Sequence, residues 1–280
     1  MAHASEQTKI RHIIAVSSGK GGVGKSTVSV NLASALQSRG LRVGILDADI
    51  HGPNVPLMMG VNTQPHIEKD AGGAEWFVPP EAHGIRVMSM GFLMDPEQPA
   101  IWRGPMLHNL LTQFSKQIQW GPLDVLVVDM PPGTGDVQIS LAQLFEIRGA
   151  VVVTTPQEVA LQDVRKAYTM WNKVKVPIIG VVENMSYFEP TPGAEKHYVF
   201  GRGGGAALAD RYRVPLLGEI PLSQKVREGG DEGRPVARTK DDVTAAQVFD
   251  VIAEQVIDRV EAMAAENVDP SKLVQIGRFD

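Results

Sequence analysis

Short apolar runs alternate along the chain with longer segments in which apolar residues recur at helical spacing. Continuous apolar runs of the kind found in strands buried on both faces occur at residues 13–16, 41–46, 84–90, 124–129, 150–156 and 176–184. Between them, apolar positions recur every three or four residues at 28–36, 107–118, 158–174 and 241–266. This alternation predicts an α/β fold with a doubly wound, mainly parallel sheet and helices on both faces.

The same pattern predicts one domain over residues 10–267. The polar residues 1–9 are expected to be a disordered start, and residues 268–280 a C-terminal tail. Residues 61–81 mix prolines, glycines and both polarities, so we predict a surface excursion there. No internal repeat divides the chain.

Composition excludes several classes of chemistry. The 280 residues include no cysteine, so the chain itself has no disulfide, thiolate metal site or cysteine nucleophile. A net charge of −5 argues against a broad nucleic-acid-binding surface. No apolar run approaches the ~20 residues of a membrane span, and no secretory signal is visible, so a cytoplasmic protein without a membrane or nucleic-acid partner is expected.

A glycine-rich segment between the first predicted strand and the first predicted helix carries the strongest chemical signal. It fits the phosphate-loop pattern G-x-x-x-x-G-K-[ST], read from Gly19 to Ser26. Glycines permit a cage of backbone N–H donors, Lys25 can reach the β- and γ-phosphates of ATP, and the Ser26 hydroxyl can take a position on Mg²⁺. The predicted nucleotide-binding residues of this segment are Gly19, Lys20, Gly21, Gly22, Val23, Gly24, Lys25, Ser26 and Thr27.

Polar side chains follow three other predicted strands, at the edge of the sheet where ligands bind. Asp129 ends a buried strand. In P-loop NTPases, an aspartate at the end of a strand beside the phosphate loop holds Mg²⁺. Asp47 and Asp49 can order the waters of magnesium or orient an attacking water, although turn formation also explains them. Asn184 can present a donor and an acceptor to an adenine edge.

Two further segments keep open interpretations. In residues 130–136 the prolines restrict the backbone and the glycines leave it flexible. Because the segment directly follows Asp129, it suits a switch that senses the γ-phosphate. Residues 201–205, Gly-Arg-Gly-Gly-Gly, precede a predicted helix through Tyr212 and are either an anion-binding helix start or a flexible hinge.

Several strings together resemble the Mrp/ApbC family of iron–sulfur cluster carriers, P-loop ATPases of the MinD/ParA superfamily. The resemblance runs from about Ile13 to about Ile257, and K-G-G-x-G-K-[ST] is similar to the deviant Walker A signature of that superfamily. The strings are GKGGVGKST, DADIHGPN, VVDMPPGTGD, TTPQEVALQDVRKA, GVVENMSYF, FGRGGG, and LLGEIPL with VREGGDEGRP.

The resemblance implies a magnesium-dependent ATP hydrolase that dimerises with ATP and serves a protein client. It implies that Lys20 reaches the partner's nucleotide across the dimer interface, while Lys25 holds phosphate and Asp49 positions the hydrolytic water. Ser26 would ligate Mg²⁺, with Asp47 and Asp129 acting through its waters. Asn184 and the backbone near Pro221 would hold adenine.

The chain departs from this family where the cluster would bind. Cluster-carrying members have a C-x-x-C pair after the ENMSYF-like segment, and those positions correspond here to Pro190 and Gly193. Glu189, Glu195 and His197 do not replace four thiolates, so we expect a solvated loop and no cluster on this chain's own ligands. The alternative function is a MinD/ParA-like positioning ATPase that recruits a protein partner.

Overall fold

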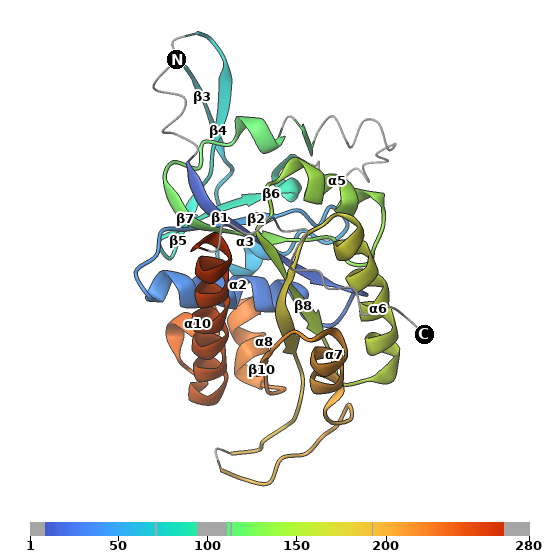
Figure 1. Ribbon diagram of the computed structural model, residues 1–280. Helices are drawn as coiled ribbons and strands as arrows, with labels where there is room; N and C mark the ends of the chain where they lie inside the picture. The colour runs from blue at the N-terminus through green and yellow to red at the C-terminus, as the bar shows by residue number, and fades with distance from the viewer. Residues whose placement is uncertain (1–8, 71, 94–110, 113, 192, 266–280) are drawn as a thin grey trace.

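The structure is a computed structural model that describes residues 9–265 except 71, 94–110, 113 and 192. An eight-stranded sheet runs through it in the order β10-β9-β8-β1-β7-β2-β6-β5 (Figure 1). Neighbouring strands are parallel except the short pair β5–β6. The strands are β1 Ile10–Ser18, β2 Val43–Asp47, β5 Glu81–Ala82, β6 Ile85–Ser89, β7 Leu123–Asp129, β8 Gly149–Thr154, β9 Ile178–Glu183 and β10 Leu216–Glu219.

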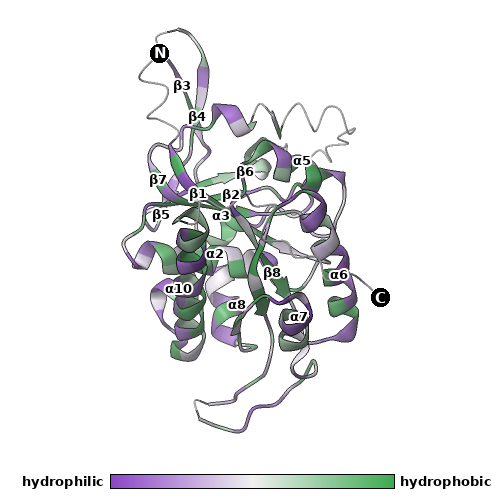
Figure 2. Ribbon diagram, in the orientation of Figure 1, coloured by the Kyte–Doolittle hydropathy of each residue, from purple (hydrophilic) through white to green (hydrophobic). Residues whose placement is uncertain are grey.

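Both faces of the sheet are covered, so strand side chains alternate between two hydrophobic cores. Ile14 and Val16 of β1 enter one core, while Ala15 enters the other. Helices α2 (Lys25–Ser38), α9 (Val236–Thr239) and α10 (Val243–Ala265) pack against the first core. Helices α5 (Asp136–Leu144), α6 (Glu158–Lys173) and α7 (Gly204–Tyr212) pack against the second. Figure 2 shows the hydrophobic residues along the central strands, and the predicted doubly wound fold is confirmed.

The predicted surface excursion contains structure that the sequence pattern did not reveal. Strands β3 (His66–Lys69) and β4 (Glu75–Val78) form an exposed antiparallel hairpin. The ring of Phe77 anchors the hairpin against Phe114, with ring centroids 6.3 Å apart. All four residues of β3 are exposed, so no alternation of buried and polar positions marks them as a strand.

Several short elements were also absent from the sequence predictions. Besides α5, α9 and β10, they are α3 (Val55–Met58), the 3-10 turn at Met90–Leu93 and α8 (Gln224–Asp231). Of the helix predicted at 107–118, residues 111–112 and 114–117 are helical, and the part up to 110 lies outside the described residues. The proposed start and tail lie almost entirely outside them too, so the predicted domain bounds stay a prediction. No helix in the described part is long and apolar enough to cross a membrane.

Candidate nucleotide-binding site

The glycine-rich segment turns directly from β1 into α2. Gly24 is the N-terminal cap residue of α2, has φ of 83°, and accepts a hydrogen bond from the N–H of Val28 at 3.0 Å. Gly22 also has a left-handed backbone, with φ of 81°. Side chains with a Cβ rarely adopt this region, so both positions favour glycine. The first backbone N–H groups of α2 therefore face outward at a helix N-terminus, where an anion is stabilised.

The four glycines serve two different purposes. A Cβ on Gly19 would lie 2.2 Å from the backbone carbonyl carbon of Asp163, and one on Gly24 would lie 2.1 Å from Nδ2 of Asn184. A Cβ on Gly21 or Gly22 would meet no heavy atom within 4 Å. Two glycines thus permit close packing of the loop on its surroundings. The other two leave open space beside its backbone.

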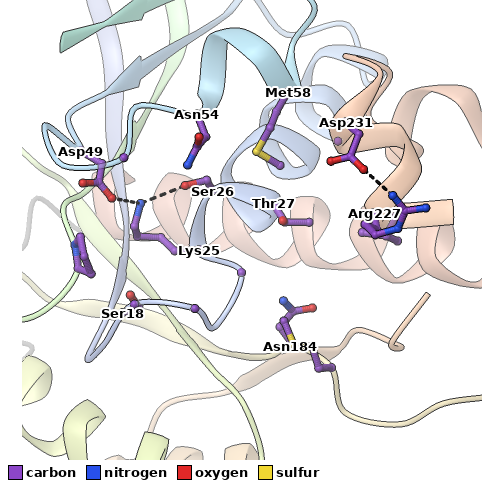
Figure 3. Close-up of a pocket in the computed structure, with 18 of the residues that line it drawn as sticks. Ser18, Lys25, Ser26, Thr27, Asp49, Asn54, Met58, Asn184, Arg227 and Asp231 are labelled. Carbon is purple, nitrogen blue, oxygen red and sulfur yellow. Dashed lines mark hydrogen bonds and ion pairs between the residues drawn. The ribbon is translucent and has the colours of Figure 1, made fainter. Parts of the chain in front are cut away.

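Oppositely charged side chains meet directly behind this loop. Nζ of Lys25 lies 2.7 Å from Oδ2 of Asp129. It also lies 3.6 Å from Oδ2 of Asp49 (Figure 3). The Ser26 hydroxyl donates to the same Oδ2 of Asp129 at 2.7 Å, and the Ser29 hydroxyl donates to its Oδ1 at 2.6 Å. Lys25, Asp49 and Asp129 are all buried. The sequence did not indicate Ser29, whose only signal is its place one helical turn beyond Lys25.

A second carboxylate lies deeper, at the end of β2. Asp47 accepts hydrogen bonds from the backbone N–H groups of Asp49 and Val55 and from the hydroxyl of Ser89, each at 3.1 Å. Its burial, and next the charge of Asp129, raise the pKa of the Asp47 carboxyl to about 8. Asp47 therefore favours the protonated form in this arrangement, whereas a nearby cation would favour the charged form.

A cavity of about 490 Å³ opens in front of the loop and contains most of the predicted residues. Those that line it are Lys20, Gly21, Gly22, Gly24, Lys25, Ser26, Thr27, Asp49, Asn184 and Pro221. Those that do not line it are Gly19, which packs on α6, Val23, which is in the core, and the buried pair Asp47 and Asp129. Residues from α3 and α8 complete the wall and were not predicted; they include Leu57, Met58, Val226, Arg227 and Asp231.

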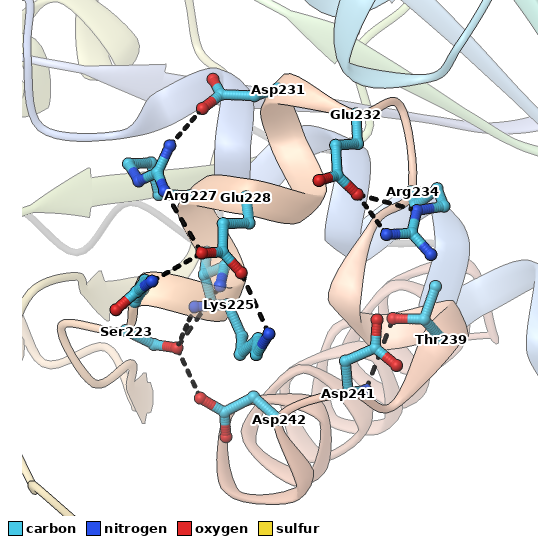
Figure 4. Close-up of polar contacts among 12 residues, drawn as sticks. Ser223, Lys225, Arg227, Glu228, Asp231, Glu232, Arg234, Thr239, Asp241 and Asp242 are labelled. Carbon is cyan, nitrogen blue, oxygen red and sulfur yellow. Dashed lines mark hydrogen bonds and ion pairs between the residues drawn. The ribbon is translucent and has the colours of Figure 1, made fainter.

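The far end of the cavity is fixed by Asn184 and by helix α8. Nδ2 of Asn184 donates to the carbonyl of Val23 at 2.9 Å. The Ser223 hydroxyl caps α8 by accepting from the N–H groups of Lys225 and Val226, and donates to Asp242 at 2.5 Å (Figure 4). Exposed ion pairs such as Arg227–Asp231 continue along that helix. The side chains of α8 therefore sit on a helix with a fixed start.

The chemistry of these groups fits a magnesium–nucleotide complex. A lysine ammonium and free backbone N–H groups suit phosphate, and hydroxyl and carboxylate oxygens suit Mg²⁺, which keeps waters and binds few protein ligands. In the described part, no three His, Cys, Asp or Glu side chains converge to hold a metal by themselves. The phosphates and Ser26 would have to supply ligands, as P-loop sites require.

The loop after Asn184 does not fit an iron–sulfur cluster. Phe188 and His197 exchange backbone hydrogen bonds at 2.8 Å, which closes a hairpin-like loop. Within it, Glu189 accepts from the N–H of Gly193 at 2.8 Å, while Glu195 and His197 are exposed. The whole chain lacks cysteine, so this loop offers no thiolate to iron.

Comparison with known proteins places this geometry among iron-transfer P-loop NTPases. The ParA family model described as "NUBPL iron-transfer P-loop NTPase" matches residues 9–257. An "Iron-sulfur cluster carrier protein" from Synechocystis sp. is 49% identical over 258 residues, which are 92% of this chain and 73% of that protein.

Two solved structures share the fold and hold nucleotide. A nucleotide-binding protein from Archaeoglobus fulgidus in complex with ADP is 38% identical, with a TM-score of 0.71 over 82% of this chain and 89% of that one. The septum site-determining protein MinD of Pyrococcus horikoshii, complexed with Mg-ADP, is 26% identical, with a TM-score of 0.65 over 92% of this chain and 99% of that one.

Proposed function

Because the chain belongs to the ParA-type family of iron-transfer P-loop NTPases, we propose that it binds magnesium and ATP in the 490 Å³ cavity and hydrolyses the ATP. The observation that carries the proposal is the cluster of Lys25, Ser26 and Asp129 directly behind an open glycine loop. A buried lysine there can exchange a carboxylate partner for phosphate oxygens without leaving its site.

Five of the predicted side chains act at the phosphates in this reaction. Lys25 holds the β- and γ-phosphates, and Ser26 provides a ligand to magnesium, with Asp129 and Asp47 holding its waters. When bound, magnesium neutralises phosphate charge. Asp49 orients a water whose oxygen attacks the γ-phosphorus; the bond to the β–γ bridging oxygen breaks, and ADP and phosphate leave.

Asn184 and Pro221 hold the adenine end of the nucleotide. The Asn184 side chain is already fixed by its bond to Val23, so it can present a defined donor and acceptor pattern to the base. Both residues line the cavity, and Figure 3 shows Asn184 at the side away from Asp49.

The nucleotide acts as a switch for a homodimer that serves a protein client. Lys20 lines the cavity and is only half-buried, so its ammonium can reach the nucleotide of a second copy. The client is expected to be an iron–sulfur apoprotein or scaffold, because the relatives are named as cluster carriers. Any cluster that the complex handles would require the client's thiolates.

Calorimetry with magnesium–ATP and sedimentation of the same samples test the proposal. We expect saturable binding by the wild-type protein and ATP-dependent dimerisation that Lys20→Ala abolishes. Asp49→Asn should keep ATP binding while turnover falls about 100-fold or more, since only the attacking water loses its partner. Absence of any affinity for magnesium–ATP would refute the proposal. Unchanged dimerisation of Lys20→Ala would refute its dimer part.

A further inference from the structure

Helix α7 begins with a cap that comes from another element. Its N-terminal cap residue is Gly203, with φ of 75°. Glycine has no side chain that could accept a hydrogen bond from the first N–H groups of the helix. Instead the N–H of Gly205, in the first turn, donates to Oε2 of Glu183 at 2.5 Å. Glu183 is the last residue of β9 and is fully buried. A strand carboxylate thus takes the place of an N-cap and is stabilised by the helix dipole.

The same carboxylate also fixes the chain just beyond β9. Oε1 of Glu183 accepts from the hydroxyl of Ser186 at 2.5 Å. Glu183 forms no ion pair with any residue that the structure describes. Within the described residues, its two oxygens thus accept two short hydrogen bonds, one of them from the first turn of α7. Because Ser186 precedes the loop 187–203 and Gly205 follows it, one buried carboxylate holds both ends of that loop.

The run of glycines at this helix start permits the contact. A Cβ on Gly205 would lie 2.8 Å from Cβ of Glu183, and one on Gly204 would lie 2.8 Å from the carbonyl oxygen of Pro156. The sequence left open whether residues 201–205 form an anion-binding helix start or a hinge. The anion at this helix start is a carboxylate of the chain itself.

The residue after Glu183 contacts the phosphate loop. Successive side chains at a strand end point to opposite sides, so Asn184 faces away from α7. Nδ2 of Asn184 donates to the carbonyl of Val23 at 2.9 Å and lies where a Cβ of Gly24 would be. Its backbone N–H donates to Thr154 of β8 at 2.8 Å. Two consecutive residues therefore connect the glycine-rich segment on one side with the 187–203 loop on the other.

We propose that Glu183 is a positioning residue that couples the 19–24 segment to the 187–203 loop through Asn184. A displacement of Val23 or Gly24 towards Asn184 moves its side chain, because Nδ2 is hydrogen-bonded to the carbonyl of Val23 and lies 2.1 Å from where a Cβ of Gly24 would be. Glu183 transmits this movement to Ser186 and Gly205, since its carboxylate is fixed to both. That a nucleotide causes the displacement rests on the proposed function; the coupling itself does not.

Amide hydrogen exchange without nucleotide tests the coupling. In Glu183→Ala the first turn of α7 and the 187–203 loop should exchange about tenfold faster, as expected when charge-assisted hydrogen bonds are lost. The decisive readout is the 19–25 segment, which should also exchange several-fold faster. Leu208→Ala is the matched control: it opens a buried position of α7 and removes neither hydrogen-bond partner of Glu183, so it should accelerate exchange in α7 but not at 19–25.

A milder variant covers the case in which Glu183→Ala does not fold. Ser186→Ala removes one hydroxyl and leaves the bond between Glu183 and Gly205, so exchange at 19–25 should rise to a smaller extent. The proposal is overturned if these variants accelerate exchange only near their own positions, or if 19–25 responds equally in Leu208→Ala.

A second hydrogen-exchange experiment, with magnesium–ADP added, tests whether bound nucleotide acts through this coupling. ADP should slow exchange at both 19–27 and 187–203 in the wild-type protein. The protection of 187–203 should be lost in Glu183→Ala and reduced in Ser186→Ala, while 19–27 stays protected in both. If the wild-type protein shows no effect of ADP, the proposed function fails, while the nucleotide-free arm still decides the coupling. Equal protection of 187–203 in the wild-type protein and the variants would overturn the coupling.

Discussion

At the scale of single residues, the candidate site depends on one buried carboxylate with three donors. Asp129 accepts from the ammonium of Lys25 and from two hydroxyls, those of Ser26 and Ser29. Removing one partner of a buried ion pair leaves an uncompensated charge, which costs more than the pair contributes. The contacts that hold Lys25 beside the phosphate loop therefore also stabilise the protein when no nucleotide is bound.

Loss of the Lys25 ammonium should thus be measurable without any nucleotide. In Lys25→Met we expect the free energy of unfolding at neutral pH to fall by about 3 kcal/mol, because Asp129 loses its nearest cation. Lys20→Met removes the same charge from a half-buried position that has no ion pair with the described residues, and should change stability by about 0.5 kcal/mol or less. Urea denaturation of the two variants compares them. Equal losses would show that the buried pair has no special contribution.

Asp47 should give the stability of the protein a distinct pH dependence. Its pKa rises from 3.8 to about 8 on folding, so between these values the folded state holds a proton that the unfolded chain releases. Stability from this group is therefore present at low pH and is lost as pH rises towards 8. Urea denaturation at pH 5 and pH 8, with chelator present, should show a smaller pH difference in Asp47→Asn than in the wild type. Parallel profiles would contradict this origin.

At the scale of elements, the glycine-rich segment separates packing from binding. Gly24→Ala places a Cβ against Asn184 at a backbone with positive φ, so the free energy of unfolding should fall by about 1–2 kcal/mol. Gly21→Ala meets nothing within 4 Å, so its stability should stay within about 0.5 kcal/mol. The new methyl group would nevertheless occupy space beside the cavity, and we expect magnesium–ATP affinity to fall. Calorimetry and urea denaturation check both; full affinity in Gly21→Ala would contradict the placement of the phosphates.

Sequence patterns predicted the elements that are long, buried and periodic. Strands β1, β2, β7, β8 and β9 were recognisable because both of their faces are buried, and α6 and α10 because each presents a sustained apolar stripe. Helix α8 has no buried residue, so no repeat of buried apolar positions indicated a helix there. The sequence therefore did not predict that this helix forms one wall of the cavity. The loop residues were predictable from their motif, whereas the contact of Glu183 with Gly205 spans 22 positions and depends on tertiary packing.

At the scale of the whole molecule, the sheet order explains why these residues meet. The central strand β1 has β7 on one side and β8 on the other. Its carboxyl end, which leads into the glycine-rich segment, therefore lies beside the end of β7, which carries Asp129. One strand further out lie the end of β2 with Asp47 and, on the other side, the end of β9, which Asn184 follows. Ligands bind at such crevices beyond the strand ends of open α/β sheets. The loop after Asn184 leaves from the same edge of the sheet as the glycine-rich segment.

The absence of cysteine leads to a prediction for the assembled protein. Iron–sulfur clusters are held by thiolates, so anaerobic reconstitution of the wild-type protein with iron and sulfide should give no stable cluster absorbance. Replacing Pro190 and Gly193 together by cysteine gives the chain a C-x-x-C pair at the positions where the resemblance predicts one. Gly193 has φ of 84°, so a cysteine there is strained and the pair should bind more weakly than an unstrained one.

The decisive measurement combines iron analysis with sedimentation. If two chains each give two thiolates to one cluster, cluster absorbance of the double variant should appear only in the dimer fraction, at about four thiolates per cluster. The single variant Pro190→Cys is the control, since one thiolate per chain cannot complete that ligand set. A stable cluster in the wild-type protein would contradict the prediction that a chain without cysteine cannot bind one.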